Sequence, residues 1–71
     1  MDTSVENIQR LCAIHIARYT RMIASNHPFV RVDECQMYLG IWKAIEAKGY
    51  KWIDLNTTEQ REIVDAIDGD E

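Results

Sequence analysis

The chain has 71 residues, of which 46% are hydrophobic and 28% charged, and its formal net charge is -4 at pH 7. This length allows one domain with one small core, and the composition is that of a globular rather than a disordered protein. No apolar run reaches the ~18 residues of a membrane span, and the first residues lack the pattern of a signal peptide. Two cysteines are too few for a secreted disulfide framework, so we expect a cytoplasmic location.

The charges are sorted along the sequence. Residues 7–32 carry four arginines, two histidines and no acid, whereas residues 54–71 carry seven acids and a single base, Arg61. The modest net charge therefore conceals two regions of opposite sign. Such sorting bears on partners and association rather than on the fold.

A first helix is predicted over residues 3–25. Thr3 and Glu6 have the spacing of a capping box, and neither Gly nor Pro interrupts the run that follows. At 100° per residue, the apolar side chains share an arc of about 140°, the width of a core-facing stripe. The stripe consists of Val5, Ile8, Leu11, Cys12, His15, Ile16, Tyr19, Met22 and Ile23.

A second helix is predicted over residues 33–48, after a break at Pro28. Asp33 and Gln36 form a second capping box, and Gly49 is a typical stop. The apolar residues of this helix spread over about 220°, more than one neighbouring helix can cover. The helix is therefore either the central element of the monomer or part of a dimer seam. We expect a homodimer whose interface is formed by Met37, Gly40, Ile41 and Ala44.

A third helix is predicted over residues 57–67. Asn56, Thr57 and Thr58 are three possible caps, and the apolar face is narrow. Asp65 and Asp68 near its end oppose the helix dipole, so we expect fraying after Ile67 and an acidic tail over residues 68–71.

These elements predict an all-α fold of three helices in a single domain, with the first two forming an antiparallel hairpin. An alternative pairs residues 29–32 and 50–54 as two very short strands, because periodicity cannot separate a strand from a packed loop at that length.

Two cysteines and two histidines raise the question of a zinc site or a nucleophile. In an antiparallel hairpin, Cys35 lies ~16 Å along the axis from Cys12, so four ligands cannot reach one ion. Cys12 and His15 fall on the apolar stripe, and no Asn or Asp lies one turn from His15 on that face to orient it. We therefore expect no metal site, no catalytic residue and no cofactor.

The strongest candidate for direct function is the polar face of the first helix. Arg10, Arg18 and Arg21 fall within about 80° of one another and surround Ile14. Arginines around an aliphatic residue are a plausible composition for a binding hot spot. The competing interpretation is that these arginines only solubilise the helix, or pair with the acids of the C-terminal region in the same chain or in a symmetry mate.

Two further surfaces are candidates for partner binding. Four acids on or after the third helix form an acidic face that would suit a basic protein surface, or that is merely solvated: Glu59, Glu62, Asp65 and Asp68. Tyr50 and Trp52, in the connector before that helix, would form an aromatic contact patch if they are exposed.

We therefore expect a non-enzymatic binding or regulatory protein, an inhibitor or adaptor that occupies a charged partner surface. The size is compatible with small inhibitors from phages or mobile elements, although no motif indicates one. The alternative is a nucleic-acid-binding regulator that uses the arginines of the first helix, a modest footprint for phosphates. A helix-turn-helix is disfavoured because the third helix is the most acidic part of the chain.

Overall fold

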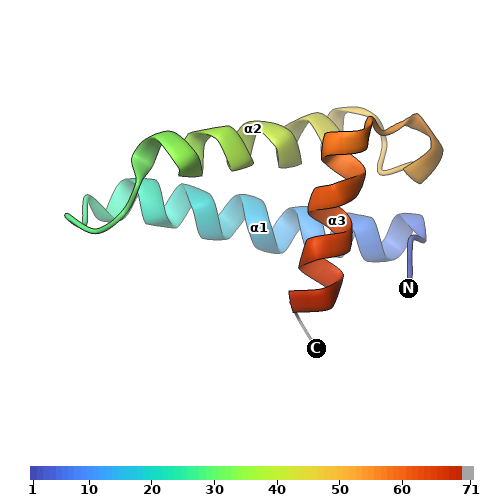
Figure 1. Cartoon of the computed structure of the whole chain (residues 1–71), viewed down its shortest axis with the longest axis horizontal. Coiled ribbons are helices and arrows are strands. Elements are labelled where there is room, and N and C mark those ends of the chain that lie inside the picture. The colour runs from blue at the N-terminus through green and yellow to red at the C-terminus, as the bar shows by residue number, and fades with distance from the viewer. Residues whose placement is uncertain (70–71) are drawn as a thin grey trace.

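A computed structural model describes residues 1–69 of the chain. It contains three α-helices, α1 (Val5–Ser25), α2 (Val32–Ala47) and α3 (Thr57–Gly69), and a short 3-10 turn, η1 (Trp52–Asp54). α1 and α2 run antiparallel as a hairpin, and α3 crosses them near the end where α1 begins and α2 ends (Figure 1). The predicted three-helix, all-α fold is confirmed. The strand alternative is wrong, since no strand occurs between residues 1 and 69.

Two of the predicted helix caps are wrong. Ser4, not Thr3, caps α1: its backbone is extended and its Oγ accepts a hydrogen bond from the Asn7 N–H at 3.3 Å. α2 begins at Val32, and the preceding Arg31 makes no side-chain cap. Asp33 consequently lies inside the first turn, where its charge complements the positive end of the helix dipole.

Asn56 is the cap of α3, one of the three residues that the sequence offered. The Glu59 N–H donates to Asn56 Oδ1 at 2.8 Å, and the Asn56 N–H donates to Glu59 Oε1 at 2.9 Å. This reciprocal pair is a complete capping box, which satisfies two backbone donors at the start of the helix. α3 extends to Gly69, two residues beyond the expected end at Ile67. The rest of the expected tail, residues 70–71, lies outside the described part of the chain.

The end of α2 is a Schellman motif, as the position of Gly49 predicts. Gly49 has a φ of 76°, its N–H donates to the Glu46 carbonyl, and the Tyr50 N–H donates to the Ile45 carbonyl. These bonds turn the chain back, so that Tyr50 packs against the core.

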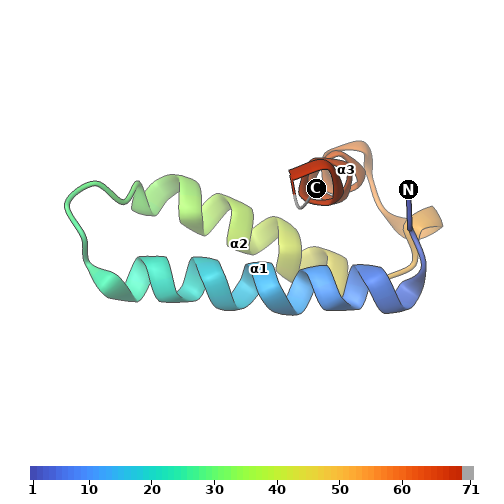
Figure 2. The same ribbon diagram turned by 90° about the horizontal axis from the view of Figure 1, so that it is seen from below.

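The core lies at the end of the hairpin where α3 crosses. Its buried residues come from all three helices and from the connector before α3: Ile8, Leu11, Cys12, Trp42, Ile45, Leu55 and Ile63. Figure 2 shows α3 against one side of the hairpin only. The wide spread of apolar residues around α2 is therefore explained within one subunit, because α2 contacts α1 along its length and α3 near its end.

The other half of the hairpin consists of two helices without a third. Tyr19 of α1 and Tyr38 of α2 stack there, with ring centroids 5.6 Å apart. Among residues 1–69, no helix combines the length and apolar character needed to cross a membrane.

Candidate interaction surfaces

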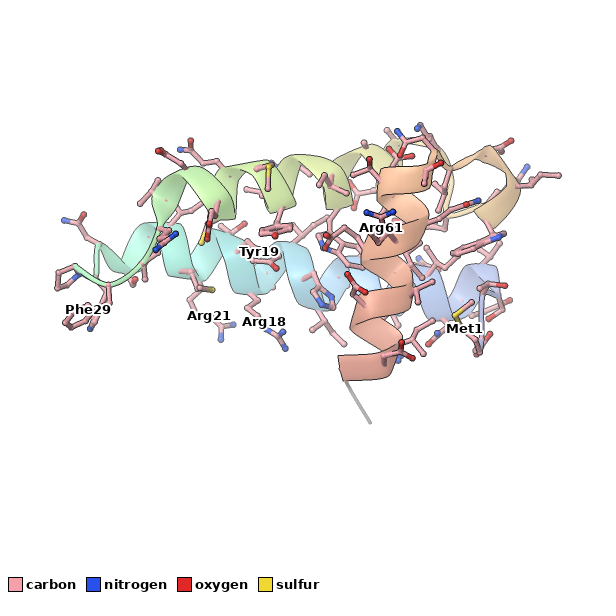
Figure 3. The ribbon with its side chains drawn as sticks, in the orientation of Figure 1. Met1, Arg18, Tyr19, Arg21, Phe29 and Arg61 are labelled. Atoms are coloured by element: carbon pink, nitrogen blue, oxygen red, sulfur yellow. The ribbon has the colours of Figure 1, made fainter. Side chains whose placement is uncertain are left out.

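The basic surface of α1, defined as Arg10, Ile14, Arg18 and Arg21, is exposed along its length. Ile14 is 38% exposed in the middle of this surface. Arg18 and Arg21 project from α1 on the side away from α2 (Figure 3). The guanidinium of Arg10 is held by its own helix, because Nη2 and Nε donate to Asn7 Oδ1 at 2.9 and 3.2 Å. The helical spacing thus produces the surface that the sequence predicts.

No acid within residues 1–69 pairs with this surface. The described chain contains two ion pairs, Arg31 with Glu34 at 3.4 Å and Lys48 with Glu59 at 2.5 Å. Neither ion pair includes an arginine of the basic surface. No ion pair among the described residues therefore supports the interpretation that these arginines neutralise acids of the same chain.

Glu59 belongs to the fold rather than to an exposed acidic face. Its side chain is held by the capping box and by Lys48, and the residue is only 3% exposed. The expected acidic face is thus reduced to three residues of α3, which we call the acidic edge: Glu62, Asp65 and Asp68.

Glu62 is the half-buried member of the acidic edge. Burial, and then the negative charge of Asp65, raise the pKa of the Glu62 carboxyl. Burial also raises the pKa of Tyr19, and the next contribution comes from the charge of Glu62. Asp65 and Asp68 follow on the exposed surface of α3.

The aromatic connector is half-buried rather than a free patch. Tyr50 and Trp52 both pack against the core, and the Trp52 carbonyl accepts a hydrogen bond from Gln60 Nε2 at 3.1 Å. The large apolar side chain that the connector exposes is Ile53, at 87%. Ile53 lies in the 3-10 turn between the half-buried Trp52 and the exposed Asp54, where no helical periodicity signals which side chains are exposed.

The four residues expected at a dimer interface differ in how exposed they are on α2. Met37 is 54% exposed and Gly40 is exposed, with no atom within 4 Å of a Cβ built on it. Ile41 and Ala44 are half-buried, and Ile41 packs against the core. Open space lies beside Gly40, but Ile41, another residue of the expected interface, already packs against the core of its own subunit.

The cysteines and histidines are dispersed. Cys12 and Cys35 are buried free thiols, and burial raises the pKa of Cys12 to about 12, which keeps it protonated at neutral pH. His15 stacks on Trp42 with centroids 4.3 Å apart, and its Nδ1 lies 2.7 Å from the Leu11 carbonyl oxygen. Over residues 1–69, no three His, Cys, Asp or Glu side chains are grouped so that they could hold a metal ion.

The loop between α1 and α2 exposes a residue that the sequence interpretation missed. Phe29 follows Pro28 and is 87% exposed at the tip of the hairpin (Figure 3). The sequence did contain a signal that Phe29 would be exposed. The residue lies between the two predicted helices, so the apolar stripe of neither helix could bury it.

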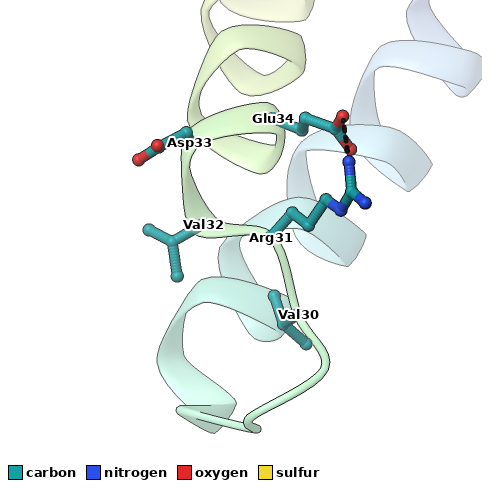
Figure 4. Close-up of a pocket in the computed structure, with 5 residues that line it drawn as sticks. All are labelled: Val30, Arg31, Val32, Asp33 and Glu34. Carbon is teal, nitrogen blue, oxygen red and sulfur yellow. Dashed lines mark hydrogen bonds and ion pairs between the residues drawn. The ribbon is translucent and has the colours of Figure 1, made fainter.

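A shallow hollow of about 450 Å³ lies beside this loop, lined by Val30, Arg31, Val32, Asp33 and Glu34. Figure 4 shows that the side chains of Val32 and Asp33 point away from those of Arg31 and Glu34, which pair with each other. Ligand pockets need a few polar groups that converge on one point. The hollow therefore lacks the arrangement of a small-molecule site.

No protein-family model, curated protein or solved structure matches this chain. Its function must therefore be inferred from the geometry of its surfaces, of which the basic surface of α1 is the most distinctive.

Proposed function

We propose that this protein is a non-enzymatic binding or regulatory protein that occupies an oppositely charged surface of a protein partner, as an inhibitor or adaptor. One observation carries the proposal. The basic surface of α1 has no ion-pair partner among residues 1–69 and surrounds the exposed Ile14.

The absence of internal pairing in this part of the chain matters for the energetics of binding. An arginine already paired within its own chain has to lose that pair before it can bind elsewhere, whereas Arg18 and Arg21 have no such pair among residues 1–69. Their charges would accelerate the encounter with an acidic surface and select against basic ones. Burial of Ile14 would add an apolar contact that salt does not screen.

The acidic edge of α3 is a second surface for a charged partner. Asp65 and Asp68 are exposed and Glu62 is half-buried, and none of the three joins an ion pair within the described residues. We also propose a reducing compartment such as the cytoplasm, because Cys12 and Cys35 are both free thiols.

Nucleic-acid binding through the basic surface is the second candidate function. Arginines that form no ion pair in the described part of the chain would suit phosphates, and each contact would make the affinity more dependent on salt. The acidic edge of α3 works against this function, since its charge repels a phosphate backbone.

The test is capture of partners from a candidate host lysate on three immobilised proteins. These are the wild type, a variant with Arg18→Glu and Arg21→Glu, and a control with Lys43→Glu and Lys51→Glu. The control makes the same change in net charge at two exposed lysines outside the basic surface. We expect the wild type and the control to retain the same protein, and the arginine variant to lose at least ~90% of it.

Nuclease treatment and salt separate the two candidate functions. A protein partner that survives nuclease and is released at high salt supports the proposal. Retention that depends on nucleic acid supports the second candidate instead. Equal retention by the arginine variant and the wild type would exclude the basic surface from both.

A further inference from the structure

Phe29 is an exposed aromatic side chain that the fold holds in a fixed position. Asn26, with a φ of 55°, ends α1, and the next four residues form a β-turn in which the Val30 N–H donates to the His27 carbonyl at 3.1 Å. The Phe29 N–H donates to His27 Nδ1 at 3.2 Å, and the centroids of the two rings lie 5.4 Å apart. Phe29 is nevertheless 87% exposed, at the tip of the hairpin (Figure 3). A partner would therefore bind this ring without first having to order the loop.

The hollow that follows Phe29 in the chain has walls that suit an aromatic ring. Val30 and Val32 supply its apolar part, and Val32 is 37% exposed. Arg31 supplies a guanidinium that lies 3.4 Å from Glu34, on a side chain that is 80% exposed (Figure 4). The face of an aromatic ring attracts a guanidinium, and its carbon atoms pack well against valine. The polar groups of the hollow do not converge on a small ligand, but a phenyl ring needs no such convergence.

The chain itself offers the ring that this hollow would accept. Among its Phe, Tyr and Trp residues, all of which lie within residues 1–69, Phe29 alone is exposed. Phe29 does not line the hollow of its own subunit, so the ring and the hollow are both available to a second copy. They also belong to one segment, residues 29–34. In a two-fold symmetric dimer every contact is made twice, so a single axis beside this segment serves both rings and both hollows.

We propose that a second copy of this chain docks at the tip of the hairpin, with the Phe29 ring of each subunit in the hollow of the other. This contact goes beyond the proposed function, because no residue of the basic surface lines the hollow. It also differs from the dimer expected from the sequence, which uses Met37, Gly40, Ile41 and Ala44 of α2.

Charge and size determine how strong this dimer should be. Residues 29–34 carry one cation, Arg31, and two acids, Asp33 and Glu34, so the contact segment has a net charge of only -1. The repulsion between more distant charges is largely screened at ~0.15 M salt. One aromatic side chain buries roughly 150–250 Å², so a contact built around two rings belongs to the weak class of interfaces, below ~1,200 Å². We therefore expect a dissociation constant on the order of 0.1 mM that changes little with salt, because the main contacts are apolar.

Sedimentation equilibrium of the wild type and three variants of unchanged net charge tests the pairing. Phe29→Ser removes the ring and Val32→Gln removes an apolar wall of the hollow, and each should raise the dissociation constant at least ~10-fold. Ile53→Ser is the matched control, because Ile53 is also 87% exposed but lies in η1. This control should change the constant less than ~2-fold.

A mixture of the first two variants tests whether the ring and the hollow meet across the dimer. In the mixed pair, Phe29 of the Val32→Gln chain can still enter the intact hollow of the Phe29→Ser chain. We expect the equimolar mixture to associate more strongly than either variant alone and more weakly than the wild type, because one of the two contacts is restored. Circular dichroism of each variant checks that the helices are retained.

A photo-crosslinker locates the contact directly. With p-benzoylphenylalanine in place of Phe29, irradiation should produce covalent dimers. Mass spectrometry of the digested dimers should find the attachment sites within residues 30–34 of the second chain.

Three results would overturn the inference: a wild-type chain that stays monomeric at ~1 mM, ten times the expected dissociation constant, a dimer that Phe29→Ser leaves intact, or attachment sites confined to residues outside 30–34. A monomeric wild type that still captures another protein through Arg18 and Arg21 would overturn the self-association and leave the proposed function standing. A dimer that depends on Phe29, in a protein whose capture of partners does not respond to the arginine variant, would support this inference and exclude the proposed function.

Discussion

At the scale of single residues, Glu59 shows how a carboxylate in an acidic stretch of sequence can serve the fold. It completes the capping box with Asn56 and pairs with Lys48, and it is almost fully buried. The spacing of Asn56 and Glu59 already indicated a helix cap. The sequence alone could not show that Lys48 lies beside it, because that contact depends on how α3 packs against the end of α2.

Replacement of Glu59 by alanine should destabilise the protein by about 1–3 kcal/mol, the range for a lost cap and a buried hydrogen-bonded charge pair. The matched control is Asp65→Ala on the exposed side of the same helix, which should change the stability by less than ~0.5 kcal/mol. Urea denaturation followed by circular dichroism measures both. Equal effects of the two substitutions would mean that Glu59 has no special role in the fold.

Cys12 is a second residue whose environment decides its chemistry. Burial raises its pKa to about 12, so the reactive thiolate is scarce at neutral pH. We expect a mild thiol reagent at pH 7.5 to label neither Cys12 nor the equally buried Cys35 in the folded protein, and to label both after unfolding in urea. Rapid labelling of Cys12 in the folded state would contradict this result and would revive the nucleophile hypothesis.

At the scale of elements, the helices could be predicted from the sequence but their packing could not. Apolar periodicity and Gly49 located α2 to within one residue at each end. Its first residue could not be derived from capping rules, because Arg31 supplies no side-chain cap. The wide spread of apolar residues around α2 was compatible with either a dimer interface or a central position in the subunit. α3 crosses only half of the hairpin, as Figure 1 shows. This crossing determines which apolar residues of α2 are covered within the subunit.

Replacement of glycine by alanine is expected to have opposite effects on stability at Gly49 and at Gly40. Gly49 has a φ of 76°, a conformation that strains any residue with a Cβ, so Gly49→Ala should destabilise by about 1 kcal/mol. Gly40 lies inside α2 with open space around it, so Gly40→Ala should stabilise by about 0.5–1 kcal/mol. Thermal unfolding of the two variants provides the comparison. A destabilising Gly40→Ala would indicate that another backbone approaches this position closely, as in the dimer expected from the sequence.

Glu62 gives α3 a dependence on pH with a definite sign. Because burial raises its pKa in the folded state, the native protein binds this proton more tightly than the unfolded chain. The contribution of Glu62 to stability therefore falls as pH rises from its unfolded pKa through its higher folded pKa.

Glu62→Gln removes this penalty and should make the protein slightly more stable at pH 7, with the advantage vanishing as pH falls through the folded pKa. The gain should be at most ~0.5 kcal/mol, since the side chain is partly solvated. Urea denaturation at several pH values measures it. A gain that grows toward low pH would have the wrong sign.

At the scale of the whole molecule, the sequence predicted two surfaces of opposite charge but not their relative position. The spacing of Arg10, Arg18 and Arg21 was sufficient to place them on one face of α1, and the structure shows them exposed there. The position of α3 relative to this face depends on the side of the hairpin that α3 covers, and no local pattern encodes it. The exposed Phe29 and Ile53 were missed for a similar reason, because both lie in short connections where helical periodicity does not apply.

Arg18 and Arg21 form no ion pair within residues 1–69, which is the basis for the claim that they are available to a partner. The most direct test is the free energy of unfolding of a variant with Arg18→Gln and Arg21→Gln, measured in urea at a protein concentration low enough to keep the chain monomeric. We predict a value within ~0.5 kcal/mol of the wild type, because neither arginine joins an ion pair within residues 1–69. A loss of more than ~1 kcal/mol would show that the two arginines already stabilise the subunit, and would contradict the claim.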